Sequence, residues 1–190
     1  MEIKKIAIFA SGSGTNAQNI IEYFSKNEKV KIDSIWSNKE DAYVLQRAKD
    51  FKIKTFVFDK NEFVNGSFIV EKLIERRIDL IVLAGFLWLL PSNLTQNFKI
   101  INIHPALLPK YGGKGMYGMN VHNAVVENRE TESGISIHFV NDKYDDGEMI
   151  FQAKCPVLST DLPDDVANKI HKLEYKHFPE EIEKVLLHSY

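Results

Sequence analysis

The chain has 190 residues, 44% of them hydrophobic and 26% charged, which is enough apolar sequence for the core of one ordinary domain. Its 24 lysines and arginines nearly balance 26 aspartates and glutamates, and a formal net charge of -2 disfavours proteins that bind nucleic acids or membrane surfaces. A lone cysteine, Cys155, excludes an internal disulfide and a cysteine-rich zinc cluster, and the first residues do not form a signal peptide, so we expect a cytoplasmic protein.

Short apolar runs alternate with helical patterns over the first hundred residues, which is typical of stacked βαβ units with a parallel sheet. The predicted strands are Lys5–Ala10, Val30–Trp36, Lys54–Phe58, Leu80–Ala84 and Lys99–Ile103. The predicted crossover helices, with apolar residues three and four apart, are Asn16–Phe24, Ala42–Phe51 and Phe68–Arg77. Residues 6–10 and 80–84 are continuously apolar, which indicates strands covered on both faces.

The pattern changes in the C-terminal half. A segment rich in proline and glycine, residues 105–118, precedes a predicted helix around Val121–Asn128. Two further predicted strands, Gly134–Val140 and Glu148–Val157, flank a polar loop. This half therefore carries an antiparallel or mixed edge and most of the long loops, where functional sites usually lie.

The end of the chain, Asp164–Leu187, has an apolar helical stripe. We expect Pro179 to break or restart this helix, because proline cannot donate a helical hydrogen bond. No internal repeat or linker is present, so a single domain over residues 1–190 is expected.

A glycine-rich loop, residues 11–16, joins the first predicted strand to the first predicted helix. Glycines let the backbone approach a ligand, and a helix N-terminus presents unpaired N–H groups to an anion. The loop therefore predicts a phosphate site. A tight turn capped by Thr15 or Asn16 is a simpler interpretation, and it is compatible with phosphate binding.

Dinucleotide binding is the sharper alternative, because Gly12, Gly14 and Ala17 fit the G-x-G-x-x-G/A fingerprint. That fingerprint also requires an acidic residue at the end of the second strand. The chain has Ser37-Asn38-Lys39 there, so a phosphorylated small molecule is favoured over NAD.

Two polar residues, Asn102 and His104, occur at the end of the fifth predicted strand. They are two residues apart, so both side chains point to one face of the sheet. An amide and an imidazole on an apolar strand cost free energy unless they are hydrogen-bonded or used, and we interpret them as candidate catalytic residues. A carboxylate partner is expected from the acidic loop at residues 141–148, although spacing alone does not select one.

Four motifs are spread along the chain: Ser11-Gly12-Ser13-Gly14-Thr15-Asn16, Ala84-Gly85-Phe86, Asn102-Ile103-His104-Pro105-Ala106-Leu107-Leu108-Pro109-Lys110-Tyr111, and His138-Phe139-Val140 followed by Asp145-Asp146-Gly147. Together they resemble the phosphoribosylglycinamide formyltransferase family, folate-dependent enzymes of purine synthesis. The resemblance extends from the first strand to the last helix. The third motif is highly specific for folate formyltransferases.

The resemblance implies an α/β, Rossmann-like formyltransferase fold, with a mostly parallel sheet and helices on both faces. It implies transfer of a formyl group from the cosubstrate 10-formyltetrahydrofolate to the amine of glycinamide ribonucleotide, in purine (IMP) biosynthesis, with no metal. Residues from about 1 to 100 would form the phosphate-binding half, and residues from about 101 to 190 the folate and catalytic half.

The resemblance implies Asn102, His104 and Asp145 as catalytic residues. In the family, the acid is the first residue of an Asp-x-Gly triplet, seven residues after a histidine, and counting from His138 selects Asp145 rather than Asp146. The Asn102 amide and a protonated His104 would stabilise the negative oxygen that develops on the formyl group. Asp145 would raise the pKa of His104 and, with water, accept the amine proton.

The resemblance also implies ligand contacts. The implied substrate-binding residues are Gly12, Gly14, Thr15, Asn16, His171 and Glu174. The implied folate-pocket residues are Leu83, Phe86, Leu87, Trp88, Leu89, Leu90, Val140, Asn141, Asp142 and Tyr144, although for the apolar ones a core position is an equally good interpretation. Trp88 departs from the family, because many members carry arginine there.

Other functions stay open at this point. A formyltransferase that acts on an amino-sugar nucleotide shares the Asn-x-His and Asp pattern, and so does methionyl-tRNA formyltransferase, which the charge balance disfavours. A non-catalytic nucleotide- or folate-binding module is the alternative from a different class. We expect small-molecule partners only, no nucleic acid or membrane, and a monomer or homodimer.

Overall fold

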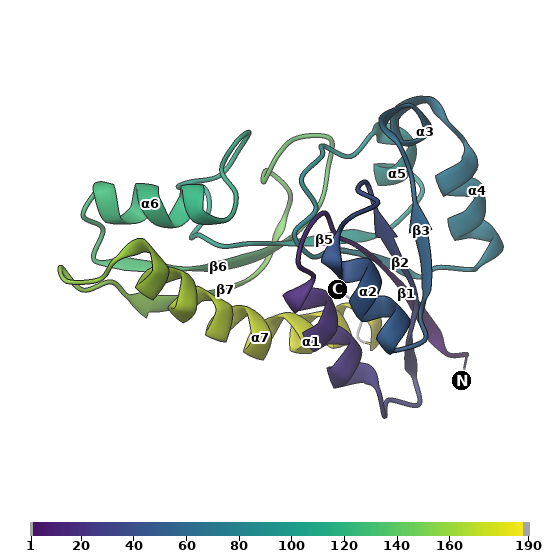
Figure 1. Ribbon diagram of the computed structural model, residues 1–190, viewed down its shortest axis with the longest axis horizontal. Helices are drawn as coiled ribbons and strands as arrows, with labels where there is room; N and C mark the ends of the chain where they lie inside the picture. Colours follow the sequence, from purple (N-terminus) through teal and green to yellow (C-terminus); the bar gives the residue numbers. More distant parts are fainter. Residues whose placement is uncertain (1, 188–190) are drawn as a thin grey trace.

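The computed structural model describes residues 2–187, which fold around one seven-stranded sheet (Figure 1). The strands are β1 Lys4–Phe9, β2 Val30–Ser37, β3 Lys54–Val57, β4 Leu80–Leu83, β5 Ile100–His104, β6 Glu132–Phe139 and β7 Met149–Pro156. Their order across the sheet is β3-β2-β1-β4-β5-β6-β7. Strands β1 to β5 are parallel, whereas β6 and β7 pair antiparallel. The predicted mostly parallel sheet with an antiparallel C-terminal edge is therefore confirmed.

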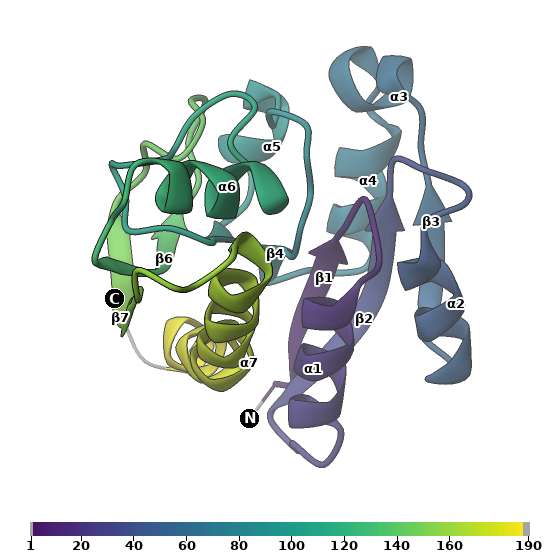
Figure 2. The ribbon, with the colours of Figure 1, turned by 60° about the vertical axis from the view of Figure 1, so that its left-hand side comes forward.

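Helices cover both faces of the sheet, as Figure 2 shows. They are α1 Thr15–Phe24, α2 Tyr43–Asp50, α3 Lys60–Asn65, α4 Phe68–Glu75, α5 Ser92–Thr95, α6 Met119–Glu127 and α7 Pro163–Leu187. One face carries α1, α2, α6 and α7, and the other carries α3, α4 and α5. The sequence analysis missed α3, although Asp59 and Glu62 form a capping box at its start, and it missed the single turn of α5. No helix within residues 2–187 combines the length and apolar character that a membrane span requires.

The continuous apolar run of β1 follows from its central place in the sheet. Ile6 and Ile8 point into the core beneath α1, α2, α6 and α7, whereas Ala7 and Phe9 point into the core on the opposite face. The second core is rich in aromatic rings, and Phe9 stacks on Trp36 with 5.6 Å between ring centroids. Alternate residues of this run thus fill two cores, which is why residues 6–9 include no polar side chain.

Helix α7 runs through Pro179 without a break, so the expected interruption is wrong. Proline has no N–H to donate to the carbonyl four residues earlier, which belongs to Tyr175. The side chain of Asn19 on α1 donates to that carbonyl oxygen at 2.9 Å. A neighbouring helix therefore supplies the hydrogen bond that Pro179 cannot form, and the helix continues.

The strand order places a crevice beside β1. Strand β1 pairs with β2 on one side and with β4 on the other. The chain that leaves β1 continues to β2, and the chain that leaves β4 continues to β5 on the other side, so the two connections diverge at the carboxyl ends of β1 and β4. Open α/β sheets bind ligands at such a switch point. The glycine loop after β1 and the polar end of β5 both lie at this edge of the sheet.

Candidate active site

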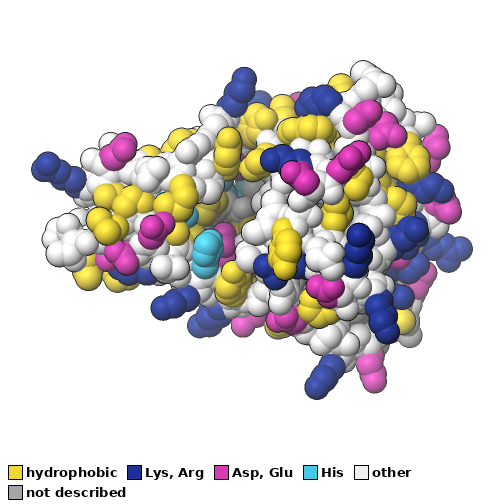
Figure 3. Space-filling view, in the orientation of Figure 1, with side chains coloured by type: hydrophobic (Ala, Val, Ile, Leu, Met, Phe, Trp, Pro, Cys, Tyr) yellow, Lys and Arg dark blue, Asp and Glu magenta, His cyan; other side chains and the backbone are white. Residues whose placement is uncertain are grey.

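A cavity of about 680 Å³ opens at this edge, and Figure 3 shows it as a hollow with histidine side chains at its rim and inside it. The residues expected from the sequence that line it are Gly12, Gly14, Thr15, Asn16, Phe86, Leu87, Asn102, His104, Tyr144, Asp145, His171 and Glu174. Lining residues that the sequence analysis did not assign include Ser11, Ser13, Lys39, His122 and the segment 113–118. Ser11 and Ser13 belong to the glycine-rich loop itself, whereas Lys39, His122 and residues 113–118 come from other segments that no local motif links to it.

The glycine loop forms one wall of the cavity. Helix α1 begins at Thr15 with Gly14 as its N-cap residue, and no side chain caps it, so the expected caps from Thr15 or Asn16 do not form. Asn16 instead donates from Nδ2 to Glu174 Oε2 at 3.0 Å, and its buried Oδ1 has no partner. A helix start without a side-chain cap suits an anionic ligand such as phosphate.

Gly14 is glycine for a different reason from the expected one. Its backbone is left-handed, with φ of 74°, and the place of a Cβ is taken by Val44 of α2. Packing between loop and helix therefore requires this glycine. Gly12 has open space where its Cβ would be, so only Gly12 fits the expectation of room beside a ligand.

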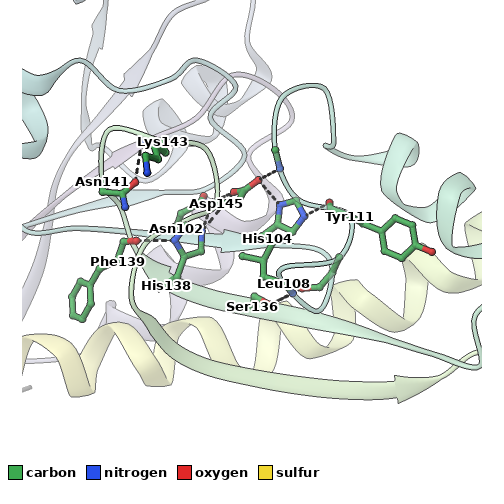
Figure 4. Close-up of polar contacts among 12 residues, drawn as sticks. Asn102, His104, Leu108, Tyr111, Ser136, His138, Phe139, Asn141, Lys143 and Asp145 are labelled. Carbon is green, nitrogen blue, oxygen red and sulfur yellow. Dashed lines mark hydrogen bonds and ion pairs between the residues drawn. The ribbon is translucent and has the colours of Figure 1, made fainter.

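Asn102, His104 and Asp145 come together at the cavity (Figure 4). The first two extend from β5, and Asp145 reaches in from the loop between β6 and β7. Asp145 Oδ2 lies 3.5 Å from His104 Nδ1, and Asn102 Nδ2 donates to Asp145 Oδ1 at 3.5 Å. Asp146 is exposed and pairs with Lys143 at 3.6 Å.

The imidazole of His104 has an acceptor beside each nitrogen. Nε2 donates to the carbonyl oxygen of Tyr111 at 2.8 Å, and Nδ1 faces the Asp145 carboxylate. A neutral imidazole has one N–H, so in that form the proton sits on Nε2 and Nδ1 keeps its lone pair. Burial lowers the pKa of His104, and the charge of Asp145 and the Tyr111 carbonyl offset this only in part.

A protonated His104 was expected, but the net change in its pKa is downward, so this expectation is wrong. Asp145 does raise the pKa of the imidazole, as expected, but His104 is only 4% exposed. Removal of the cation from water outweighs its attraction to the carboxylate. The lowered pKa favours the uncharged form of His104 at neutral pH, with its Nδ1 directed toward Asp145.

Asp145 stays ionised at neutral pH. Burial raises its pKa, but the adjacent His138 side chain, the electrostatic interaction with His104 and the N–H of Gly113 together bring the pKa below its ordinary value. The Gly113 N–H donates to Asp145 Oδ2 at 2.9 Å. The site thus pairs a carboxylate with a neutral imidazole, a combination suited to moving a proton.

Backbone geometry explains the Asp-x-Gly triplet. Asp145 has a left-handed backbone, with φ of 51°, which turns the loop back toward the sheet. A Cβ on Gly147 would overlap the carbonyl oxygen of Phe139. Glycine is therefore required two residues after Asp145 for the loop to return against β6.

His138 belongs to the same cluster, although the sequence analysis used it only to count to Asp145. It lies opposite Asn102 in the antiparallel pair of β5 and β6. Its Nδ1 donates to the Phe139 carbonyl at 2.7 Å, so Nε2 accepts from Asn102 Nδ2 at 3.2 Å. His138 Nε2 also lies 3.6 Å from Asp145 Oδ1. The sequence alone does not give the register of β5 and β6, which brings His138 to Asn102, so this member of the cluster was missed.

Helices α6 and α7 add two buried titratable groups to the lining of the cavity. Burial raises the pKa of Glu174 on α7 to about 7, although the Asn16 hydrogen bond acts in the other direction. Burial lowers the pKa of His122 on α6 to about 4, and its Nδ1 has no partner. His171 is exposed at the rim of the cavity. This part of the lining offers hydrogen-bonding groups with little fixed charge.

The residues expected around folate divide into two groups. Phe86, Leu87 and Tyr144 line the cavity. Leu83 and Leu90 are buried in the second core, and Trp88 and Val140 pack against it. Leu89 and Asp142 are exposed. Asn141 accepts a hydrogen bond from the Lys143 N–H. The core interpretation thus describes the surroundings of five of these residues, because Phe86 also packs against the second core.

Metal ligation does not explain the cluster. Within residues 2–187, no group of three or more histidine, cysteine or acidic side chains is arranged to hold a metal ion. The ring nitrogens of His104 and His138 instead take part in the hydrogen bonds described above.

The fold and the site define the class of the protein. The sequence profile of the formyl transferase family matches residues 4–182, which span both the glycine loop and the Asn102–Asp145 cluster. The chain belongs to this family.

Relatives with a more specific name match most of the chain. A phosphoribosylglycinamide formyltransferase from Haemophilus influenzae is 40% identical over 184 residues, 93% of this chain and 84% of the relative. One from Escherichia coli is 35% identical over 182 residues, 92% of this chain and 83% of the relative. The crystal structure of phosphoribosylglycinamide formyltransferase from Streptococcus pneumoniae superposes with a TM-score of 0.84 at 34% identity, over 96% of this chain and 99% of that one. The family resemblance found in the sequence is confirmed.

Proposed function

We propose that this protein transfers the formyl group of 10-formyltetrahydrofolate to the amine of glycinamide ribonucleotide in purine (IMP) biosynthesis. The observation that carries the proposal is one cavity that holds both the Asn102–His104–Asp145 cluster and the glycine loop. The cluster supplies groups for proton transfer and developing charge, and the loop supplies an anion site for a phosphorylated acceptor. The relatives that carry this enzyme's name support the choice of acceptor.

His104 and Asp145 handle the protons in this proposal. The amine forms a bond to the formyl carbon while the bond from that carbon to the folate nitrogen breaks, so one proton leaves the amine and one reaches the folate nitrogen. The lone pair of His104 Nδ1, 3.5 Å from the Asp145 carboxylate, takes up the first proton. The negative charge of Asp145 stabilises the imidazolium, which then supplies the second proton.

Asn102 donates to the oxygen that becomes negative. Its amide nitrogen donates to His138 Nε2 at 3.2 Å and to Asp145 Oδ1 at 3.5 Å. The second contact is long for a hydrogen bond, so a formyl oxygen can replace it at little cost. A donor aimed at developing charge lowers the barrier by about 3 kcal/mol.

Two sets of residues that line the cavity suit the two substrates. The start of α1, with Gly12 and Thr15, takes the phosphate, and Glu174 and Asn16 Oδ1 accept hydrogen bonds from sugar hydroxyls. Apolar and aromatic lining side chains, Phe86, Leu87 and Tyr144, suit the folate. A volume of about 680 Å³ lies within the usual range of small-molecule sites.

The test is a formyl-transfer assay on the purified chain with glycinamide ribonucleotide and 10-formyltetrahydrofolate. We expect turnover by the parent protein, and a loss of about 100-fold in kcat for Asn102→Ala at unchanged stability. Turnover with an amino-sugar nucleotide in place of the ribonucleotide would support the alternative acceptor. Tight binding of both substrates by calorimetry with no turnover would contradict the proposal and support a binding module.

The setting of the enzyme is part of the same proposal. We propose a cytoplasmic monomer or homodimer with small-molecule partners, supported by the lone cysteine and the nearly balanced charge. Size-exclusion chromatography with light scattering, with and without substrates, measures the oligomeric state.

A further inference from the structure

A short turn after β5 holds both His104 and Asp145. The carbonyl oxygen of Tyr111 accepts the His104 Nε2 proton at 2.8 Å. Two residues later, the N–H of Gly113 donates to Asp145 Oδ2 at 2.9 Å. The backbone of residues 111–113 therefore fixes the imidazole and the carboxylate relative to each other.

The backbone of this turn is in an unfavourable conformation. Tyr111 has φ of 56°, in the left-handed region that residues with a Cβ disfavour. The other non-glycine residues with positive φ in the described chain, apart from Asp145, are Lys52, Arg77 and Arg129. Each of those three follows the end of a helix, where a left-handed residue is ordinary. Tyr111 follows no helix, so other contacts must hold it in this conformation.

The side chain of Tyr111 supplies those contacts. Its hydroxyl donates to Glu130 Oε1 at 2.8 Å, and its ring packs against the core beneath α6 and α7. Lys110 Nζ donates to the same carboxylate at 3.0 and 3.3 Å. The hydrogen bonds from Lys110 and Tyr111 lower the pKa of Glu130, so it is ionised at neutral pH. A hydroxyl bound to a carboxylate is a stronger anchor than a neutral hydrogen bond.

We propose that Tyr111 and Glu130 are positioning residues of the reaction. Glu130 holds the Tyr111 side chain, and Tyr111 thereby holds its carbonyl against His104 Nε2. This keeps the His104 proton on Nε2 and leaves Nδ1 as the base that faces Asp145. The inference rests on the proposed function, and nothing in it requires Tyr111 or Glu130 to touch a substrate.

Four variants separate positioning from general stability. Tyr111→Phe keeps the ring and removes the hydroxyl, and Glu130→Ala removes its acceptor. We expect each to lower kcat about tenfold with KM changed less than twofold, because a hydrogen bond to a charged group is worth roughly that factor. Glu130→Gln keeps an oxygen acceptor and should stay within about threefold of the parent. The matched control is Glu132→Ala, since that exposed carboxylate pairs with Lys154 at 2.8 Å and has no link to the turn.

A second readout does not depend on activity. Nitrogen NMR of the histidine rings, with His104 assigned from a His104→Gln variant, reports which nitrogen carries the proton. We expect the Nε2–H form in the parent and in Glu132→Ala, and a mixture of both forms in Tyr111→Phe and Glu130→Ala. His104 should also titrate at lower pH in those two variants, because the Tyr111 carbonyl raises its pKa. Neither substitution replaces the other titratable groups near the ring, which are Asp145, His138 and His122.

The outcomes separate the two proposals. A parent protein without formyl transfer contradicts the proposed function, while the NMR comparison still tests the turn. An active parent whose Tyr111→Phe and Glu130→Ala variants keep both the kcat and the Nε2–H form would overturn the inference. A loss of kcat with the parent's tautomer and titration would overturn it as well, because it would show a general structural effect.

Discussion

Gly14 and Val44 lie in direct contact between the glycine loop and α2, since a Cβ built on Gly14 would be 2.5 Å from the Cβ of Val44. Gly14 also has a left-handed backbone, which a residue with a Cβ disfavours. Gly12, two residues earlier, has no heavy atom within 4 Å of its Cβ position. One glycine of the loop is therefore required for packing, and the other leaves space beside the cavity.

Substitution of these two glycines should give opposite results. We expect Gly14→Ala to lower the free energy of unfolding by about 3 kcal/mol through overpacking and backbone strain. Gly12→Ala should change it by less than about 0.5 kcal/mol and raise KM for glycinamide ribonucleotide about tenfold, with KM for the folate unchanged. Urea unfolding and steady-state kinetics measure the two effects. An unchanged ribonucleotide KM for Gly12→Ala would remove the loop from the substrate site.

The neighbouring carboxylates Asp145 and Asp146 provide a matched comparison. Asp145→Asn removes the charge that raises the pKa of His104, so that pKa should fall further, and kcat should drop about 100-fold or more. Asp146→Asn should change kcat less than about twofold, because its side chain is 56% exposed and pairs with Lys143 at the surface. NMR titration of His104 and the kcat of both folded variants are the measurements. Loss of activity in Asp146→Asn alone would mean that the catalytic acid is one residue later.

Local patterns were sufficient for the framework of the fold. The central strands β1 and β4 carry continuous apolar runs, residues 6–9 and 80–83, because helices cover both faces of the sheet, so their burial is visible in the sequence itself. Asn102 and His104 could be placed on one face of the sheet from the sequence, because they lie two residues apart on one strand. The break expected at Pro179 was wrong, because Asn19 donates to the carbonyl that the proline leaves without a donor. Asn19 lies 156 residues from that carbonyl in the sequence, so local patterns could not show the contact.

Non-local contacts set the limits for the site. His138 meets Asn102 only through the register of β5 and β6, and Asn16 meets Glu174 across 158 residues. The direction of the His104 pKa also depended on burial, which exceeds the effect of the nearby carboxylate. Spacing could not separate Asp145 from its neighbours, because the left-handed backbone at Asp145 decides which carboxylate points inward. The family resemblance supplied that choice.

Glu174 should make stability depend on pH. Its pKa is about 7 in the folded protein against an ordinary 4.5, so the folded state binds more protons between these values and its stability falls as pH rises through them. Glu174→Gln mimics the neutral acid and keeps an acceptor for Asn16. At pH 8 the variant should be more stable than the parent by at most about 3 kcal/mol, and at pH 4 the two should be equal.

Urea unfolding of parent and Glu174→Gln at several pH values isolates this group, because the other titrations cancel in the difference. A difference that does not grow between pH 4 and pH 8 would show that Glu174 is ionised normally in the folded protein. Kinetics on the same variant test the proposed contact with the sugar. KM for the ribonucleotide should rise while KM for the folate stays constant.

The bond from Asn19 to the Tyr175 carbonyl predicts a coupling between α1 and Pro179. Asn19→Ala leaves that carbonyl without a donor and should cost about 1 kcal/mol of unfolding free energy. Pro179→Ala restores an N–H to the helix, so Asn19→Ala should cost about 0.5 kcal/mol or less in that background. Tyr23→Phe is the control, because the Tyr23 hydroxyl joins α1 to α7 through Glu183 at 2.8 Å and should cost the same in both backgrounds. Urea unfolding of the six proteins gives both coupling energies. If Asn19→Ala costs the same with and without Pro179, the hydrogen bond does not compensate for the proline, and another contact must keep α7 continuous.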